Sequence, residues 1–227
     1  MDTSGTRPVY YDCHTGIDDS MGLAYLLGSP EIHLVGIGTV SGNTEASQAA
    51  ENTLRLLWLA GQTDIPVAIG ATHFLTRKYG GAPTEIHGDN GIGNRDLPKV
   101  NATPVTESAA EMIVRLAKEQ AGELEVITVG PMTNLALALQ LDPDLPGRIK
   151  QVTSMGGAAL VPGNASPVGE ANVWNDPEAA AAVVAAPWPV TFVPLDVTLE
   201  KILEESHRAQ LLASEQPLAR AIGEILD

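Results

Sequence analysis

The segment Asp12-Cys13-His14-Thr15-Gly16-Ile17-Asp18-Asp19-Ser20 places three carboxylates and one imidazole within nine residues. Acidic residues in the first turn of a helix are favoured by the helix dipole, so Asp18 and Asp19 could simply stabilise a helix start. With Asp12 and His14 so near, however, four ionisable groups would repel or desolvate one another without a counter-charge or polar ligand. A hard cation held by carboxylate and carbonyl oxygens, with the vicinal hydroxyls of a sugar completing its shell, would relieve that conflict.

A second polar group lies between residues 163 and 176 and contains Asn164, Glu170, Asn172 and Asp176. Each could be an ordinary turn or cap residue, and Asp176 followed by Pro177 is typical of a helix N-cap and first helical position. Glu170 and Asn172 are spaced so that an extended segment would present both on one face. That face would suit hydrogen bonding to hydroxyl groups.

A third candidate is His87, which is followed by three glycines within six residues. A lone histidine in a loop is usually solvated, and that interpretation stays open. The glycines also favour a mobile cover over a site.

The hydrophobic pattern predicts the strands and helices that would position these residues. Short β-branched runs alternate with longer stretches of helical period, which is typical of βαβ units around a mostly parallel sheet. We predict one doubly wound α/β domain over residues 1–227, with long loops at 72–103 and 158–175. The predicted strands are 9–13, 33–39, 66–69, 124–129, 151–155 and 190–195. The predicted helices are 18–27, 44–60, 107–120, 134–141, 177–185, 200–212 and 216–226.

Five of the predicted strands run directly into polar or glycine-rich turns. These turns are residues 12–19, 39–43, 129–134, 155–157 and 196–198. In an open α/β sheet, ligands bind beyond the carboxyl ends of the strands. We therefore expect one pocket at that edge, built partly from main chain, with Asp12 supporting the first turn.

The composition narrows the class of protein. A formal charge of −15 over 227 residues argues against nucleic acid, whose phosphates require a basic face. No apolar run approaches the roughly 20 residues that span a bilayer, so we expect no membrane partner. The single Cys13 excludes an internal disulfide, and the chain opens without a secretion signal. We expect a cytoplasmic protein.

Taken together, these segments resemble the inosine-uridine-preferring nucleoside hydrolase family, in consistent order from Val9 to about Thr198. The opening segment is similar to the family's Asp-x-Asp-Pro-Gly-x-Asp-Asp signature. The further matching segments are Gly42-Asn43, His87-Gly88, Gly130-Pro131-Met132-Thr133-Asn134, Met155-Gly156-Gly157, Gly163-Asn164, Glu170-Ala171-Asn172 and Asp176-Pro177-Glu178.

The resemblance implies a Rossmann-like fold and hydrolysis of the N-glycosidic bond of purine or pyrimidine ribonucleosides to ribose and free base. It also implies a calcium ion and a homo-oligomer, a dimer or tetramer. Asp19 and the backbone carbonyl of Val129 would bind the ion. The residues implied to bind substrate are Asp18 and Asn172 at the 2′- and 3′-hydroxyls, Asn164 and Glu170 at the 5′-hydroxyl, Asn43 and Met155 along the ribose, and His87 near the base.

Two features of this chain differ from the family pattern. His14 stands where the family has an aspartate that binds calcium and acts as general base. Imidazole is a poor calcium ligand but a competent base near neutral pH, so His14 is a candidate catalytic residue together with Asp18. The chain also ends about a hundred residues earlier than usual, so we expect a carboxyl-terminally shortened member. An impaired homologue that binds ribose or nucleosides without turnover is the alternative.

Overall fold

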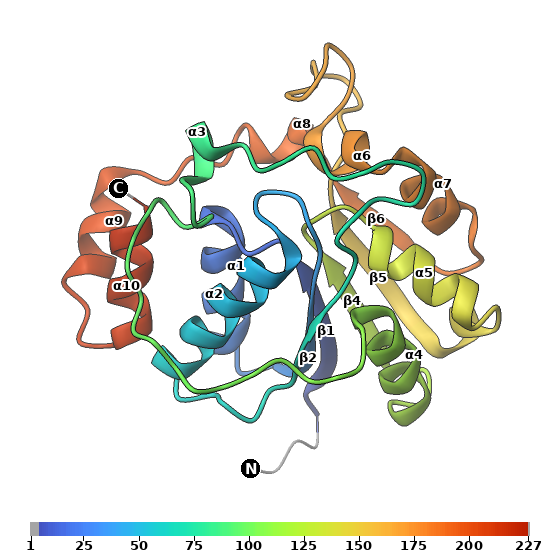
Figure 1. The fold of residues 1–227 in the computed structure, drawn as a ribbon, viewed down its shortest axis with the longest axis horizontal. Helices are drawn as coiled ribbons and strands as arrows, with labels where there is room; N and C mark the ends of the chain where they lie inside the picture. The colour runs from blue at the N-terminus through green and yellow to red at the C-terminus, as the bar shows by residue number, and fades with distance from the viewer. Residues whose placement is uncertain (1–4, 227) are drawn as a thin grey trace.

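The computed structural model describes residues 5–226, and the strands in that range form one parallel sheet (Figure 1). The strand order is β3-β2-β1-β4-β5-β6, and every neighbouring pair is parallel. The strands are β1 (Arg7–Cys13), β2 (Ile32–Thr39), β3 (Val67–Ile69), β4 (Leu124–Thr128), β5 (Ile149–Met155) and β6 (Val190–Val193). The chain winds outward from β1 to β3, then returns to β4 beside β1. The carboxyl ends of β1 and β4 therefore flank the switch point at which such sheets bind ligands.

Helices cover both faces of the sheet. The main helices are α1 (Ile17–Gly28), α2 (Ala46–Leu59), α4 (Ala109–Glu119), α5 (Thr133–Leu141), α7 (Pro177–Ala185), α9 (Glu205–Leu212) and α10 (Pro217–Ile225). Short elements are α3 (Thr84–His87), the 3-10 turn η1 (Leu145–Arg148), α6 (Ala171–Asn175) and α8 (Leu195–Thr198). One buried cluster joins the sheet to α1, α2 and α10, and another joins it to α4, α5 and α7. In Figure 1 these two helical groups lie on opposite sides of the strands.

Strand β1 shows why the sheet needs both layers. Val9, Tyr11 and Cys13 pack in the cluster with α1 and α2, whereas Tyr10 packs in the cluster with α4 and α5. Successive side chains of a strand point to opposite faces, so a strand with buried apolar side chains on both faces must be covered by helices on both sides. Strand β1 ends at Cys13, and the polar turn that follows is still buried at His14, Thr15 and Gly16.

The six predicted strands and the doubly wound class are confirmed, with ends shifted by one to two residues. Two expectations were wrong, at residues 170–172 and 200–204, and the sixth strand is two residues shorter than predicted. Residues 170–172 are not extended, because α6 begins at Ala171. The sixth strand ends at Val193 rather than at residue 195, since α8 starts two residues later. The helix expected from residue 200 begins only at Glu205, as α9.

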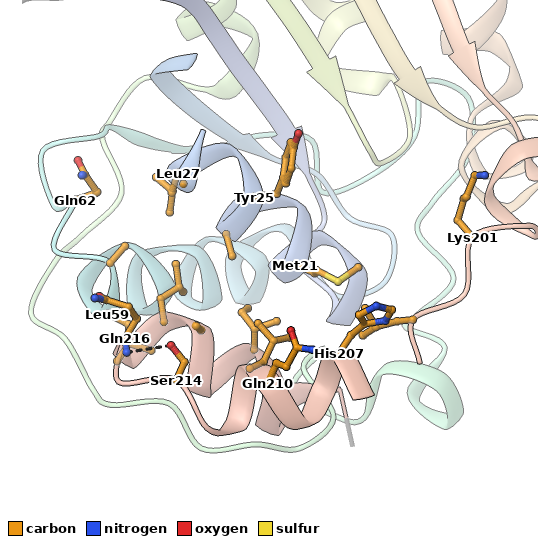
Figure 2. A pocket seen from close by; sticks show the side chains of 18 of the residues that line it. Met21, Tyr25, Leu27, Leu59, Gln62, Lys201, His207, Gln210, Ser214 and Gln216 are labelled. Atoms are coloured by element: carbon orange, nitrogen blue, oxygen red, sulfur yellow. Dashed lines mark hydrogen bonds between the residues drawn. The ribbon is translucent and has the colours of Figure 1, made fainter. Parts of the chain in front are cut away.

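An apolar groove of about 880 Å³ lies between α1 and the α9–α10 pair. Figure 2 shows Met21 of α1 on the side of the groove near His207 and Gln210 of α9, whereas Tyr25 points away from α9. None of its lining residues contributes to the polar cleft described below. Across residues 5–226, the helices are all too short or too polar to cross a membrane.

Candidate functional site

A polar cleft of about 880 Å³ opens at the carboxyl edge of the sheet. Its lining includes His14, a predicted catalytic residue, and all the residues predicted to bind substrate, which are Asp18, Asn43, His87, Met155, Asn164, Glu170 and Asn172. These residues come from turns after β1, β2 and β5 and from the two long loops. The structure therefore gathers the predicted substrate-binding residues into one cleft, whereas the predicted metal ligands Asp19 and Val129 do not line it.

Asp19 is buried beneath the floor of the cleft, in the first turn of α1. Its Oδ2 atom accepts hydrogen bonds from the backbone nitrogen of Gly16 at 3.0 Å and from Nδ2 of Asn43 at 3.4 Å. Its Oδ1 atom accepts from the backbone nitrogen of His14 at 3.2 Å. A carboxylate at the third helical position commonly reaches back to the N-cap in this way. The start of α1 therefore fixes the orientation of Asp19.

His14 is buried and links Asp19 to Asn172. Its Nδ1 atom lies 3.0 Å from Oδ2 of Asp19, and its Nε2 atom lies 2.9 Å from Oδ1 of Asn172. Burial lowers the pKa of His14, but the adjacent Asp19 carboxylate outweighs burial and raises that pKa to about 9. Burial by itself would raise the pKa of Asp19. The adjacent His14 outweighs burial, so the pKa of Asp19 is lowered. The two residues form a buried ion pair.

The orientation of the Asn172 amide is fixed by its other contacts. Its Nδ2 atom donates to the backbone carbonyls of Val129 at 3.0 Å and Met155 at 3.1 Å, and it also lies 3.3 Å from Sδ of Met155. Carbonyl oxygens only accept hydrogen bonds, so the amide oxygen must face His14. Asn172 therefore ties the ends of β4 and β5 to the imidazole.

Asp18 differs from Asp19 although the two are adjacent. Its side chain is exposed to the cleft, whereas Asp19 is turned inward. The surrounding cleft walls, followed by the neighbouring Asp19 charge, raise the pKa of Asp18. Asp18 is consequently a carboxylate that a ligand can reach and that accepts a proton more readily than a solvated one.

Glu170 is buried at the N-cap of α6, where its carboxylate accepts three backbone hydrogen bonds. The donors are the nitrogens of Asn172 at 2.9 Å, Val173 at 3.1 Å and Gly157 at 2.9 Å. Oδ1 of Asn164 accepts from the backbone nitrogen of Ala171 at 2.9 Å. Both side chains therefore stabilise the loop that carries Asn172, in addition to facing the cleft.

His87 lies at the end of α3, on the wall opposite α6. Its Nδ1 atom accepts a hydrogen bond from the backbone nitrogen of Ile17 at 3.4 Å, at the start of α1. Burial lowers the pKa of His87, with the nearby Asp18 charge opposing that effect. A neutral ring in this position holds the loop against the floor of the cleft.

The sequence analysis did not select several residues of the cleft wall, among them Arg77, Tyr79 and Trp174. The Arg77 guanidinium donates to the Trp174 carbonyl at 2.6 Å and lies 4.9 Å from the centre of its indole ring. The Tyr79 hydroxyl donates to the Gly42 carbonyl at 3.0 Å. A sequence signal for these residues did exist: Arg77 and Tyr79 place a cation and an aromatic side chain in the long loop 72–103 of an acidic chain.

The expectation that Asp12 supports the first turn was wrong. It is buried behind the site, where Asn134 of α5 donates to both of its oxygens, at 3.2 and 3.0 Å. The Tyr10 hydroxyl donates to Oδ2 at 3.0 Å, and Nδ2 of Asn134 also reaches the Thr39 carbonyl at 3.0 Å. Asn134 of α5 therefore joins the end of β1, through Asp12, to the end of β2, through the Thr39 carbonyl.

The donors that the resemblance assigns to calcium do not fit that ion as they are arranged. Calcium takes about six to eight oxygen ligands. Here both Asp19 oxygens and the Val129 carbonyl already accept hydrogen bonds, and His14 offers nitrogen. Among residues 5–226, no three His, Cys, Asp or Glu side chains are placed to hold a metal ion.

An open parallel sheet with a carboxylate- and amide-lined cleft at its switch point is the architecture of an α/β enzyme that binds a polar small molecule. The family model described as inosine-uridine preferring nucleoside hydrolase matches residues 9–227. The chain belongs to that family, whose members are enzymes that cleave nucleosides.

Individual relatives agree with this membership. A probable uridine nucleosidase 2 from Arabidopsis thaliana is 39% identical over 97% of this chain and 69% of its own length. A pyrimidine-specific ribonucleoside hydrolase, RihA, from Shewanella woodyi is 36% identical over 98% of this chain and 70% of its own length. Among solved structures, a purine-preferring ribonucleoside hydrolase from Gardnerella vaginalis has a TM-score of 0.91 at 34% identity, covering 95% of this chain and 70% of its own.

Proposed function

We propose that this chain hydrolyses the N-glycosidic bond of ribonucleosides, giving ribose and a free base. The observation that carries the proposal is the convergence of Asp18, Asn43 and Asn172 on one cleft floor, beyond the ends of three strands. Carboxylate and amide groups at short range are suited to the adjacent hydroxyls of a ribose ring. Family membership supplies the reaction class.

Ribose would lie on the floor of the cleft with its 2′- and 3′-hydroxyls toward Asp18 and Asn172. Asn43 and Met155 would flank the ring, and Asn164 with Glu170 would border the 5′-hydroxyl. Asp18 is the one of these carboxylates whose side chain is exposed to the cleft, whereas Glu170 is occupied by backbone donors. Asp18 is therefore the carboxylate that is free to accept hydrogen bonds from the sugar hydroxyls.

Departure of the base leaves positive, oxocarbenium-like character on the sugar. A carboxylate beside the ring stabilises that charge, and it can take a proton from the attacking water. Asp18 has the required exposure, and its raised pKa favours accepting a proton. We therefore assign water activation to Asp18. His14 has both ring nitrogens engaged, so its role is to position Asp19 and Asn172 rather than to act as the general base.

The base would occupy the outer part of the cleft, between the loop that carries Tyr79 and His87 and the one that carries Trp174. Aromatic faces stack on purines and pyrimidines alike. The relatives include both pyrimidine-specific and purine-preferring enzymes by name, so the substrate panel must contain both.

The assembly and compartment are also proposals. We infer a homo-oligomer in the cytoplasm that acts on a small-molecule nucleoside, without a nucleic-acid or membrane partner. The charge of −15 supports the exclusion of nucleic acid. Light scattering of the purified protein tests the oligomeric state.

The test of the proposed function is release of reducing sugar from inosine, uridine, adenosine, guanosine and cytidine. The purified chain should release sugar from at least one of them, and the Asp18→Asn variant should release it far more slowly. Turnover no faster than the buffer blank across the whole panel would reject hydrolysis. Calorimetric titration with the same nucleosides would then show whether the chain binds them without cleavage.

A further inference from the structure

The imidazole ring of His14 is tightly packed at the floor of the cleft. A methyl group added at Gly42 would lie 2.4 Å from Cδ2 of His14, and one added at Gly130 would lie 2.9 Å from the same atom. Both distances are shorter than carbon atoms tolerate, so the ring packs directly against two glycine backbones. One glycine follows β2 and the other follows β4, which places the ring at the switch point of the sheet.

The polar atoms around the ring are also satisfied. Oδ2 of Asp19 receives hydrogen bonds from Gly16, His14 and Asn43. The Val129 carbonyl receives Nδ2 of Asn172. A metal ion bound here would have to break several of these bonds and displace the ring from between Gly42 and Gly130.

The hydrogen-bond pattern sets the charge of the ring. Asp19 offers an acceptor to Nδ1, and the amide orientation of Asn172 offers a second acceptor to Nε2. Both ring nitrogens must therefore donate, which only the imidazolium form can do. The ring thus puts a positive charge between an aspartate and an amide, the arrangement that a bound cation would otherwise create.

We propose that His14 takes the place of the calcium ion, so that this chain folds its nucleoside site and binds nucleosides without a metal. The inference rests on the proposed function only in taking this cleft as the nucleoside site. The positive charge is carried by His14, which belongs to the turn after β1. Assembly of the site therefore does not depend on the concentration of free calcium.

The experiment measures calcium binding directly, by equilibrium dialysis of the purified full chain with radioactive calcium. Wild type should show no saturable binding at millimolar calcium. His14→Asp should bind one calcium saturably over the same concentration range, because the substitution removes the ring and supplies a carboxylate oxygen. His33→Asp is the matched control, since it makes the same exchange at an exposed position on β2 and should bind like wild type.

The His14→Asp variant can be unstable without metal, because it brings two buried carboxylates together. Thermal unfolding with calcium and with chelator covers that case: calcium should raise the melting temperature of this variant and leave wild type unchanged. A second variant, His14→Asn, supplies a neutral oxygen without the charge conflict and should gain weaker calcium binding.

Three outcomes would overturn the proposal. One is a stoichiometric calcium site in wild type that Asp19→Asn removes. Another is the absence of calcium binding in both His14 variants, because the ring would then not be what excludes the ion. The third is an equal gain in His33→Asp. These readouts do not depend on turnover, so failure of the sugar-release assay and failure of this proposal are separate results.

Discussion

The Nε2 atom of His14 lies 2.9 Å from Oδ1 of Asn172, a residue 158 positions further along the chain. This contact joins the turn after β1 to the first turn of α6, and the same amide holds the carbonyls that follow β4 and end β5. The floor of the cleft is therefore one hydrogen-bonded unit rather than a set of independent side chains.

Replacing Asn172 by aspartate tests that unit with almost no change in shape. The new carboxylate would face the carbonyls of Val129 and Met155 without a donor for either. We expect a loss of about 1–3 kcal/mol in the free energy of unfolding and a higher KM for nucleosides. Urea unfolding and initial rates measure these changes. Asn101→Asp, at an exposed loop position, should change neither, and equal effects in the two variants would contradict the prediction.

Gly42→Ala tests the packing of His14. The added methyl group would overlap the imidazole ring, which cannot swing away because both nitrogens are bonded. Overpacking of this kind costs about 1–3 kcal/mol, and the displaced ring should also weaken nucleoside binding. Thermal unfolding and KM are the measurements. Gly147→Ala has open space around it and should stay within about 0.5 kcal/mol of wild type.

Asp18→Asn tests the catalytic assignment. The amide is isosteric but can neither accept a proton nor stabilise positive charge on the sugar, so kcat should fall by roughly 10²- to 10⁴-fold. The melting temperature should not fall, because removing one of two adjacent carboxylates relieves repulsion with Asp19. Asp64→Asn, on an exposed turn, serves as the control. Retention of most of the kcat in Asp18→Asn would reject the assignment.

Glu170→Gln separates loop support from substrate contact. Glutamine has one oxygen to offer the three backbone donors that the carboxylate now satisfies. We expect a loss of about 1–3 kcal/mol and a raised KM, since α6 carries Asn172. Glu178→Gln, on the exposed first turn of α7, should be close to neutral. A higher KM with unchanged stability would instead indicate direct contact with the ribose.

Asp12 predicts a specific pH dependence of stability. Burial raises its pKa from 3.8 to about 7, against hydrogen bonds from Asn134 and Tyr10 that lower it. A raised pKa favours the protonated folded state, so the contribution is fully present below pH 3.8 and is lost as the pH rises through about 7. Wild type should therefore lose about 1.4 kcal/mol per pH unit relative to Asp12→Asn across that window. Parallel stability curves from urea unfolding would contradict this.

Much of the fold could be read from local patterns. The six strands followed from β-branched runs, and Asp176 with Pro177 announced the start of α7, where Asp176 does accept from the Ala179 nitrogen. The short helices α3, α6 and α8 could not be found, because four or five residues carry too little periodicity. The prediction of an extended segment at Glu170 was wrong, because the Glu170 carboxylate caps the short helix α6, which begins at the next residue.

The sequence by itself determined that carboxylates, amides and a histidine would follow the strand ends, because parallel strands deliver their carboxyl ends to one edge. Only the tertiary structure decided what each side chain does there. Asp18 and Asp19 are chemically identical neighbours, yet the turn of α1 directs one into the cleft and the other beneath it. His14 became the centre of the floor because Asn172, fixed by two distant carbonyls, presents its oxygen to the ring, and no local pattern encodes a contact across 158 residues.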